Sequence, residues 1–360
     1  MSIEPLRVAY VELDPQADLN SAIFRLHLPA MALNKAGYKA TVVREDEWLA
    51  EQLAASVVCA DAHLIVMQRP WRIEHVLMMK KWLVRRKPIF IDIDDAYDRL
   101  DPGNAAYTFW NTVIMNDGRS LRRLDMLRDA MATATGITVA SKRLEEDWRA
   151  QGRTNVGYFP NYLDVSSYVG VAQKALPSPG EAAVLGFGGT TSHIKGWKES
   201  GLLPALQRLA RVRKDFRIHL HTPDERLAVS LAQAVGPYRM SWYKWMRPEL
   251  WPKAMGEFDI ALAPLSGVVD QRRSHLRVAE AMCLGIPWIG NNNGPYDEFD
   301  SFGTLIDQGA RKWEAAITDA LRDLEARKQL ASRNRDAALI QFDIYARADE
   351  IAHGYSEMMG

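Results

Sequence analysis

Residues 258–289, FDIALAPLSGVVDQRRSHLRVAEAMCLGIPWI, decide the fold of this chain. The apolar run at 260–265 predicts a short strand of a buried parallel sheet. A polar loop follows, and Ser274 is a favourable N-cap for a helix that continues to Cys283. Gly285 ends this helix, and Trp288 and Ile289 begin another strand. The stretch therefore predicts a strand, a helix and a second strand in the order typical of an α/β sheet.

The loop and the first helical turn of this stretch carry three arginines, Arg272, Arg273 and Arg277. A loop at the carboxyl end of a parallel strand that leads into a helix N-terminus is a ready site for an anion. Two guanidiniums on one helix face can hold a diphosphate by bidentate hydrogen bonds. Glu280 lies one turn further in and can accept from a ribose hydroxyl pair. The pattern is typical of a nucleotide-diphosphate site, and equally of a surface helix with an Arg–Glu ion pair.

The composition is that of a globular protein. The chain has 360 residues, 48% apolar and 25% charged, which suits two domains. Its 45 basic and 45 acidic residues cancel, so no electrostatic argument favours wrapping nucleic acid or sitting on an anionic membrane. Cys59 and Cys283 lie among apolar residues, which predicts core positions and a reducing compartment. The N-terminus lacks a signal-peptide core and no run could span a membrane, so we expect a cytoplasmic protein.

The first half of the chain alternates predicted strands and helices, which implies a parallel sheet with right-handed crossovers. Its first loop has no GxGxxG, so the dinucleotide fingerprint is absent. Arg25, one turn into the following helix, either points into a cleft or is a solvated helix charge. Asp94 and Asp95 follow the strand at 88–93, at the end of the sheet that binds ligands. With Asp92, they either act on an acceptor, bind a divalent metal, serve as a base, or cap the next turn.

The second half begins after residues 171–183, whose Pro, Ser and Gly content is that of a linker. Its first strand leads into GGTTSH, where small residues let the backbone approach a phosphate. The candidate phosphate-binding residues there are Gly188, Gly189, Thr190 and His193. His193 is also a candidate helix cap. The segment MSWYKWM at 240–246 contains Trp245, which either walls a nucleobase or packs in the core or a domain interface.

The order of these motifs resembles the two-Rossmann GT-B glycosyltransferases, and within them the group-1 family of sugar-nucleotide enzymes. The resemblance rests on GFGGTTSH, FDIALAPL, RRSHLRVAEAMCLGIPWI and GPYDEF, and on NSAIFRLHLPAMALNKAGYKATVV, FIDIDD and GITVAS in the first half. It implies an α/β fold of two Rossmann-like parallel-sheet domains facing each other across a cleft. We expect an N-terminal acceptor domain at 1–168 and a C-terminal donor-nucleotide domain at 169–340. A C-terminal helix at 341–360 would pack back on the first domain.

The resemblance also implies roles for individual residues. Glu280 matches the family glutamate that binds the donor ribose. Arg273 and Arg277 match basic positions near the donor diphosphate, where they would stabilise the leaving group. The backbone amides expected near the phosphates are those of Ser274, His275 and Leu276. The chain departs from the family at Arg272, where members often carry a glutamate, and around Gln68, where the usual catalytic histidine has no clear match.

The expected function is that of a hexosyltransferase-like enzyme, metal-independent and retaining. It would move a sugar from a nucleoside-diphosphate sugar, a co-substrate rather than a cofactor, to a glycan, a small molecule or a modified nucleic acid. The alternatives are a sugar-nucleotide epimerase or hydrolase on the same fold, and a non-catalytic nucleotide-sugar or glycan-binding protein. A basic cleft in the first domain would favour a modified DNA base as the acceptor. The candidate arginines for such a cleft, or for a solvated helix face, are Arg119, Arg122, Arg123 and Arg128.

Overall fold

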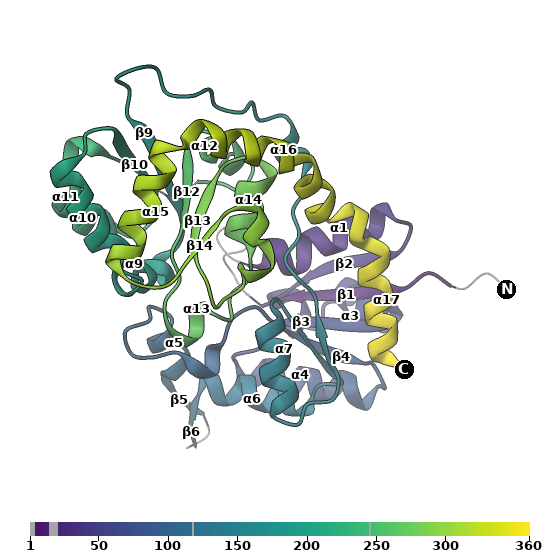
Figure 1. The fold of residues 1–360 in the computed structure, drawn as a ribbon. Coiled ribbons are helices and arrows are strands. Elements are labelled where there is room, and N and C mark those ends of the chain that lie inside the picture. Colours follow the sequence, from purple (N-terminus) through teal and green to yellow (C-terminus); the bar gives the residue numbers. More distant parts are fainter. Residues whose placement is uncertain (1–3, 14–20, 117–118, 245) are drawn as a thin grey trace. The chain divides into compact units, whose positions relative to one another are not determined.

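The computed structural model describes residues 4–13, 21–116, 119–244 and 246–360, which fold into two compact α/β units. Unit 1 contains the described residues of Met1–Pro102, Ala106–Asp164 and Asp343–Gly360. Unit 2 contains Gly103–Ala105 and the described residues of Val165–Phe342. Figure 1 shows the elements of both units. The main connections between the units therefore follow Asp164 and Phe342.

Unit 1 is built on a parallel sheet of six strands in the order β2-β1-β3-β4-β7-β8. The strands are β1 (Arg7–Glu12), β2 (Lys39–Arg44), β3 (Leu64–Gln68), β4 (Ile89–Ile93), β7 (Gly136–Val139) and β8 (Val156–Tyr158). Strand side chains alternate between the two faces of a sheet. Ile65 and Met67 on β3 accordingly pack in one hydrophobic core, and Leu64 and Val66 in another. Helices must cover both faces, which explains the continuous apolar runs of the central strands.

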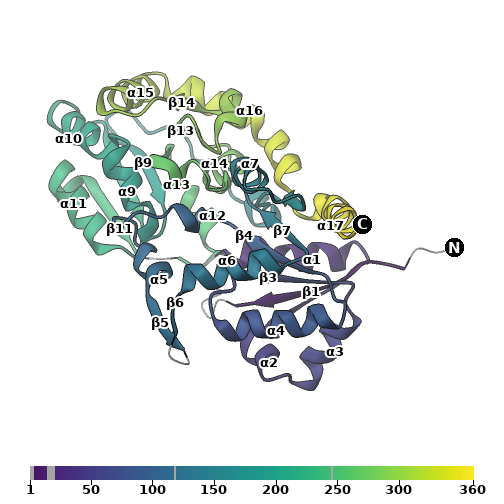
Figure 2. The ribbon, with the colours of Figure 1, turned by 90° about the horizontal axis from the view of Figure 1, so that it is seen from below.

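The helices of unit 1 cover both faces of this sheet. They are the π-helix η2 (Ile23–His27), α1 (Leu28–Lys35), α2 (Glu45–Leu49), α3 (Leu53–Asp61), α4 (Ile73–Val84), α5 (Tyr107–Asn111), α6 (Arg123–Thr133), α7 (Lys142–Ala150) and α17 (Ala348–Met359), with short turns η3 (Tyr97–Arg99) and η7 (Tyr345–Arg347). Figure 2 shows α2, α3 and α4 together below the sheet. The C-terminal helix α17 packs against α1 and β8, and Tyr355 joins the core on that face.

The structure differs from the predicted elements of unit 1 at two places. Strands β5 (Val113–Asn116) and β6 (Arg119–Arg122) form an antiparallel pair that the sequence analysis did not predict. Helix α6 consequently begins at Arg123, because Asp125 accepts hydrogen bonds from the Arg122 backbone and guanidinium and so fixes its first turn. Helices α2 and α3 fill a stretch for which no element was predicted.

Unit 2 also has a parallel sheet of six strands, in the order β11-β10-β9-β12-β13-β14. The strands are β9 (Ala183–Gly188), β10 (Phe216–His221), β11 (Met240–Tyr243), β12 (Ile260–Ala263), β13 (Trp288–Asn291) and β14 (Thr304–Ile306). The helices and turns are α8 (Ser166–Val169), η4 (Thr191–His193), α9 (Ile194–Glu199), α10 (Leu202–Val212), α11 (Glu225–Val235), η5 (Pro237–Arg239), α12 (Trp251–Met255), α13 (Gly267–Asp270), α14 (Leu276–Cys283), η6 (Asp297–Phe302), α15 (Ala310–Arg322) and α16 (Leu324–Phe342). The two parallel sheets confirm the predicted α/β class with two Rossmann-like domains.

The C-terminal helices break at different places from those predicted. Helices α15 and α16 meet at Asp323. Asp323 has φ −105° and ψ 25°, outside the helical region, and ends α15. Helix α16 continues to Phe342, and the last helix starts only at Ala348.

A buried carboxylate fastens the segment predicted as a linker to unit 2. Asp259 is fully buried at the start of β12. Its carboxylate accepts from the Lys174 ammonium at 2.6 Å, the Lys328 ammonium at 2.5 Å and the Val184 amide at 2.8 Å. Residues around Lys174 are therefore held against the sheet and against α16.

Both cysteines are buried, as predicted. Within the described residues, no helix combines the length and the apolar character needed to cross a membrane.

Candidate functional site

The candidate site of unit 2 lies where the strand order of its sheet reverses. Strand β9 pairs with β10 on one side and with β12 on the other. The loops after β9 and β12 therefore leave the same carboxyl edge of the sheet, at neighbouring strands. Such switch points are where open parallel sheets bind ligands. The predicted glycine loop and the predicted arginine loop are the two loops concerned (Figure 1).

Close packing explains the two glycines at the end of β9. A Cβ on Gly188 would lie 2.2 Å from the Trp251 ring, and a Cβ on Gly189 would lie 2.6 Å from His193 Cδ2. The same added Cβ on Gly189 would lie 3.1 Å from Arg277 Nη2. No larger residue fits at either place without a shift, so the predicted glycine loop and the predicted arginine side chains meet.

Arg273 is held in place by two loops. Its Nε donates to Asp270 Oδ1 at 2.7 Å, while Nη1 and Nη2 donate to the Ser192 hydroxyl at 3.3 Å and carbonyl at 3.2 Å. Asp270 in turn accepts from the Ser266 amide at 2.8 Å. Arg273 therefore cross-links the loop after β12 to the turn after β9.

Arg277 is partly buried, like Arg273. Its guanidinium carbon lies 4.6 Å from the centre of the Phe187 ring, in a cation–π contact. Burial lowers the pKa of Arg277 from its usual value, and the like charge of Arg273 lowers it further. A bound anion would relieve both effects.

His193 lies beside this arginine pair and is neutral at pH 7. Burial lowers the pKa of its imidazole well below the ordinary value, and the charges of Arg273 and Arg277 add to this. A neutral imidazole next to two guanidiniums can donate one hydrogen bond without adding a third positive charge. It is not a side-chain N-cap, because α9 begins after it without a side-chain cap.

Glu280 is 8% exposed and projects from α14. Burial raises the pKa of its carboxyl group to about 7, against the opposing effect of hydrogen bonds from Trp251 and Tyr168 and the charge of Arg277. The Tyr168 hydroxyl donates to Glu280 Oε1 at 3.2 Å. The carboxylate is therefore held by two aromatic side chains behind the arginine pair.

The start of the arginine helix differs from the prediction. Ser274 is not the N-cap, because α14 begins at Leu276 and His275 occupies the cap position without a side-chain cap. The preceding residues instead form the separate turn α13, which the Asp270 contacts stabilise. The His275 ring packs against Phe299 and Phe342, at centroid distances of 5.1 Å and 5.3 Å. Its side chain is thus a packing group, and its backbone leads into the helix.

Two further predicted residues complete the account of unit 2. The Thr190 hydroxyl lies 3.0 Å from the Ser192 hydroxyl, so it belongs to the same turn that contacts Arg273. Trp245, the candidate base wall, lies outside the described residues. Three aromatic rings pack together at the ends of β10 and β11. His221 stacks on Tyr243 with ring centroids 4.6 Å apart and contacts Trp251 edge-on with centroids 5.4 Å apart.

Several residues of this site escaped the sequence analysis. Asp270 was part of the polar loop, but nothing in the pattern indicated that it would hold Arg273. Tyr168 and Trp251 contact Glu280 from segments 112 and 29 residues away along the chain. No local spacing links such positions, because the sheet brings them together.

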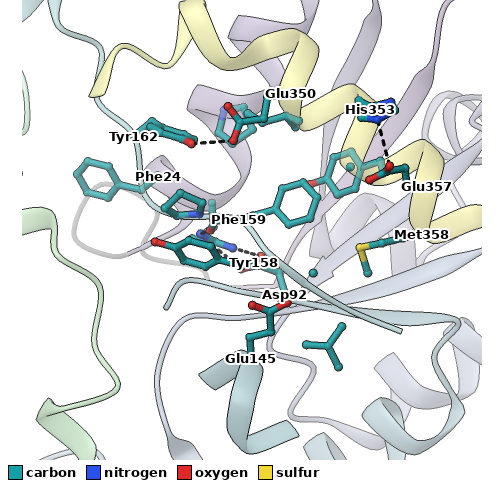
Figure 3. Close-up of a pocket in the computed structure, with 18 of the residues that line it drawn as sticks. Phe24, Asp92, Glu145, Tyr158, Phe159, Tyr162, Glu350, His353, Glu357 and Met358 are labelled. Carbon is teal, nitrogen blue, oxygen red and sulfur yellow. Dashed lines mark hydrogen bonds and ion pairs between the residues drawn. The ribbon is translucent and has the colours of Figure 1, made fainter. Parts of the chain in front are cut away.

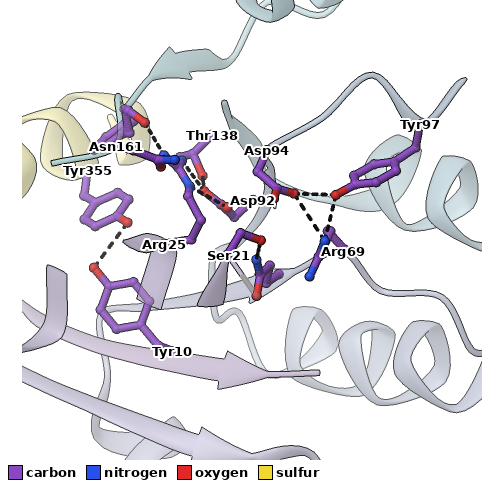
Figure 4. A network of polar contacts seen from close by, with 12 residues as sticks. Tyr10, Ser21, Arg25, Arg69, Asp92, Asp94, Tyr97, Thr138, Asn161 and Tyr355 are labelled. Atoms are coloured by element: carbon purple, nitrogen blue, oxygen red, sulfur yellow. Dashed lines mark hydrogen bonds and ion pairs between the residues drawn. The ribbon is translucent and has the colours of Figure 1, made fainter. Parts of the chain in front are cut away.

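Arg25, an acceptor-side candidate of unit 1, is buried rather than a solvated helix charge. Its Nε and Nη2 donate to the two oxygens of Asp92 at 2.9 Å and 2.5 Å. Nη1 donates to Asn161 Oδ1 at 3.0 Å and to the Phe159 carbonyl, and Thr138 donates to Asp92 at 2.7 Å. Figure 4 shows this network linking η2, β4, β7 and the loop after β8.

Asp94 has a separate set of partners at the carboxyl end of β4. Its Oδ1 accepts from the Tyr97 hydroxyl at 2.6 Å and lies 3.6 Å from Arg69 Nη1 (Figure 4). Its pKa is lowered, because the Arg69 charge and the hydrogen bonds from Ser21 and Tyr97 outweigh the effect of burial. Asp95 is partly buried, and its carbonyl accepts from the Tyr97 amide at 3.0 Å.

The acidic triplet does not form a metal site in the described chain. Asp92 and Asp94 point into the two separate networks above, and no group of three or more His, Cys, Asp or Glu residues among those described has the proximity to hold an ion.

A cavity of about 360 Å³ lies in unit 1 beside β8. Arg25, Asp92, Tyr158 and Tyr162 line it, together with residues of α7 and α17. Figure 3 shows the labelled residues of this cavity. The acceptor-side candidate Arg25 thus borders an open space even though its hydrogen bonds are internal.

The predicted basic helix of unit 1 is not one helix. Arg119 and Arg122 belong to β6, and Arg123 opens α6. Arg122 and Arg128 pair with Asp125 at 2.9 Å and 3.7 Å, while Arg123 lies over the Phe109 ring at 4.3 Å. Arg122, Arg123 and Arg128 therefore have internal partners.

Comparison with known proteins identifies the fold. No family model matches the sequence, and no curated protein sequence is significantly similar to it. Solved structures match nearly the whole chain, three of them as follows. Sucrose-phosphate synthase from Thermosynechococcus elongatus is 15% identical, with a TM-score of 0.69 over 98% of this chain and 99% of its own. HepE from Anabaena, in complex with UDP-glucose, is 15% identical, with a TM-score of 0.67 over 98% and 100%. A glycosyltransferase from Rickettsia africae is 11% identical, with a TM-score of 0.67 over 99% of both chains.

These likenesses, with the two six-stranded parallel sheets, confirm the GT-B fold that the motifs predicted. At such low identity they establish the fold and not the chemistry, which must be argued from the residues of the site.

Proposed function

We propose that this chain is a glycosyltransferase that moves a sugar from a nucleoside-diphosphate sugar to an acceptor, without a metal and with retention. The observation that carries the proposal is the meeting of Arg273, Arg277 and the Gly188–Gly189 turn at the switch point of unit 2. Asp270 pairs with Arg273, and the second guanidinium, that of Arg277, lies beside the glycine turn. This is the chemistry that recognises a diphosphate.

Each residue has a stated role in this proposal. The leaving diphosphate gains negative charge in the transition state, and fixed guanidinium donors stabilise that charge at no reorganisation cost. Arg273 and Arg277 are the proposed catalytic residues for this reason. The backbone of the glycine turn and of Ser274–Leu276, with His193, would contact the phosphates. Glu280 would accept from the ribose hydroxyls.

The similarity to HepE in complex with UDP-glucose supports a UDP-sugar as the donor. The acceptor would be bound by unit 1, where Arg25, Asp94 and Asp95 are the candidate residues. Sucrose-phosphate synthase is similar to this chain in fold only, so its name assigns no acceptor here.

The test is turnover of a panel of nucleotide sugars by the purified protein and by Arg277→Ala. Removing one preorganised donor to a developing oxyanion typically costs about 3 kcal/mol, so turnover should fall about a hundredfold or more. Arg211→Ala, at an exposed position on α10, is the control and should keep wild-type turnover. Unchanged turnover in Arg277→Ala would reject the site.

The same panel separates the alternatives. Donor consumed at the same rate with and without acceptor indicates a hydrolase or epimerase. Donor bound but not consumed with any acceptor indicates a binding protein. Activity that collapses on chelation and returns with Mn²⁺ would reject the metal-independent mechanism.

A further inference from the structure

Tyr168 reaches the donor site from the first segment of unit 2. It lies in the short helix α8, and the chain enters unit 2 after Asp164. Tyr168 is 5% exposed, and Glu280, 112 residues further along the chain, is 8% exposed. The hydroxyl-to-carboxylate distance of 3.2 Å is thus a buried contact between the entrance of the unit and the arginine helix.

Arg335 holds the backbone of α8 against the C-terminal end of α14. Its Nη2 donates to the carbonyls of Tyr168 at 2.8 Å, Val169 at 3.1 Å and Val171 at 3.2 Å. Its Nε donates to the carbonyl of Cys283, the last residue of α14, at 3.1 Å. One guanidinium thereby sets the position of α8 relative to α14. The Tyr168 hydroxyl is held in place by this attachment and not by its own flexible rotamer.

The contact limits the rotation of the Glu280 carboxylate. A carboxylate on a helix can rotate, and immobilising it on binding costs entropy that lowers the affinity for a ligand. Tyr168 donates to Oε1, and Trp251 also hydrogen-bonds to the carboxylate. The Tyr168 contact therefore helps to preorganise Glu280 before any donor arrives.

We propose that Tyr168 is a positioning residue for the donor, which holds the Glu280 carboxylate toward the ribose and makes the first connection between the units sensitive to donor binding. The inference rests on the proposed function, because it takes Glu280 as the ribose acceptor. The exit of unit 2 also touches α14, since Phe342 packs on His275 directly before that helix. Both connections are in this way attached to the helix that would carry the donor.

The experiment measures UDP binding by titration calorimetry to wild type, Tyr168→Phe and Tyr238→Phe. The phenylalanine keeps the ring and removes only the hydroxyl. Loss of one hydrogen bond to a charged group should weaken UDP binding about tenfold or more, with kcat at saturating donor unchanged and KM raised. Tyr238 is 84% exposed, so its loss of a hydroxyl should change nothing.

A second ligand separates positioning from general damage. With 2′,3′-dideoxy-UDP, which lacks both ribose hydroxyls, wild type and Tyr168→Phe should bind with equal affinity. Hydrogen exchange of residues 165–171 should slow on UDP binding in wild type and not in Tyr168→Phe. Arg335→Lys, which breaks the planar clamp, should reproduce both effects if Tyr168→Phe does not fold.

The outcomes distinguish this inference from the function on which it rests. No binding of UDP or GDP to wild type would reject the proposed function. Binding to wild type, with equal UDP affinity in Tyr168→Phe or an equal penalty with the dideoxy ligand, would overturn the role of Tyr168 alone.

Discussion

Replacing Glu280 by glutamine should stabilise the ligand-free protein and weaken its binding of UDP. The change keeps the shape of the side chain and an oxygen that can accept from Tyr168, but it removes a buried charge. The folded-state pKa of Glu280 is about 7, against an ordinary value of 4.5. Between these two pH values the folded state binds the proton that the unfolded state has lost. The carboxyl group therefore lowers the free energy of unfolding as the pH rises through this window.

The magnitude follows from the width of the window. One pKa unit corresponds to 1.36 kcal/mol, so the free energy of unfolding of the wild type falls by about 3 kcal/mol as the pH rises from the unfolded-state pKa to the folded-state pKa of Glu280. A glutamine does not titrate and causes no such fall. Because neighbouring groups relax around a buried charge, we expect Glu280→Gln to gain about 1–3 kcal/mol over wild type at pH 8 and little at pH 5. UDP affinity should fall, because a neutral amide accepts more weakly than a carboxylate.

The assay is urea unfolding of both proteins at pH 5 and pH 8, followed by UDP titration at pH 8. Glu249→Gln, at an exposed position, is the matched control and should show no pH-dependent gain. A stability difference that is the same at both pH values would refute the reasoning. A gain in stability without loss of UDP affinity would refute the role of Glu280 in donor binding while leaving its burial intact.

Two further changes test the framework that positions the site. Asp259→Ala leaves two lysines without their buried partner, and breaking such a set should cost about 3 kcal/mol of unfolding free energy. The control, Asp215→Ala, breaks the more exposed pair with Arg213 and should cost less than about 1 kcal/mol. Equal losses of the two variants in chemical unfolding would contradict a structural role for the buried Asp259 carboxylate. Gly188→Ala places a Cβ 2.2 Å from the Trp251 ring, so it should lower the unfolding free energy by about 1–3 kcal/mol and weaken UDP binding. The control is Gly170→Ala, whose Cβ meets nothing within 4 Å. A wild-type thermal midpoint in both variants would show that the close approach at Gly188 is not real.

The fold was predictable because its signals are local. Apolar runs of four to six residues such as 64–68 and 260–263 are strands, since burial on both faces leaves no polar alternation. Gly285, at φ +64°, ends α14 as its position predicted. The hairpin at 113–122 and the break at Asp323 were missed, because both depend on single contacts or dihedral angles that leave no periodic pattern.

The candidate site was predictable only in its composition. The spacing of Arg273, Arg277 and Glu280 indicated an anion-binding helix, and the glycine loop indicated a close approach. That His193 is neutral, that Asp270 fixes Arg273, and that Arg25 is buried against Asp92 depend on neighbours from other strands. Such neighbours alter pKa values by burial and charge, which sequence spacing does not encode.

The sequence by itself determined two parallel α/β sheets and the chemical character of one loop, because strand burial, helix capping and glycine turns are properties of neighbouring residues. Only the tertiary structure decided which loops meet at the edge of the sheet and what holds the ribose candidate Glu280. The reversal of strand order at β9 brings segments 70 to 90 residues apart to one edge of the sheet. Tyr168 meets Glu280 for the same reason, and no pattern within either segment announces the other.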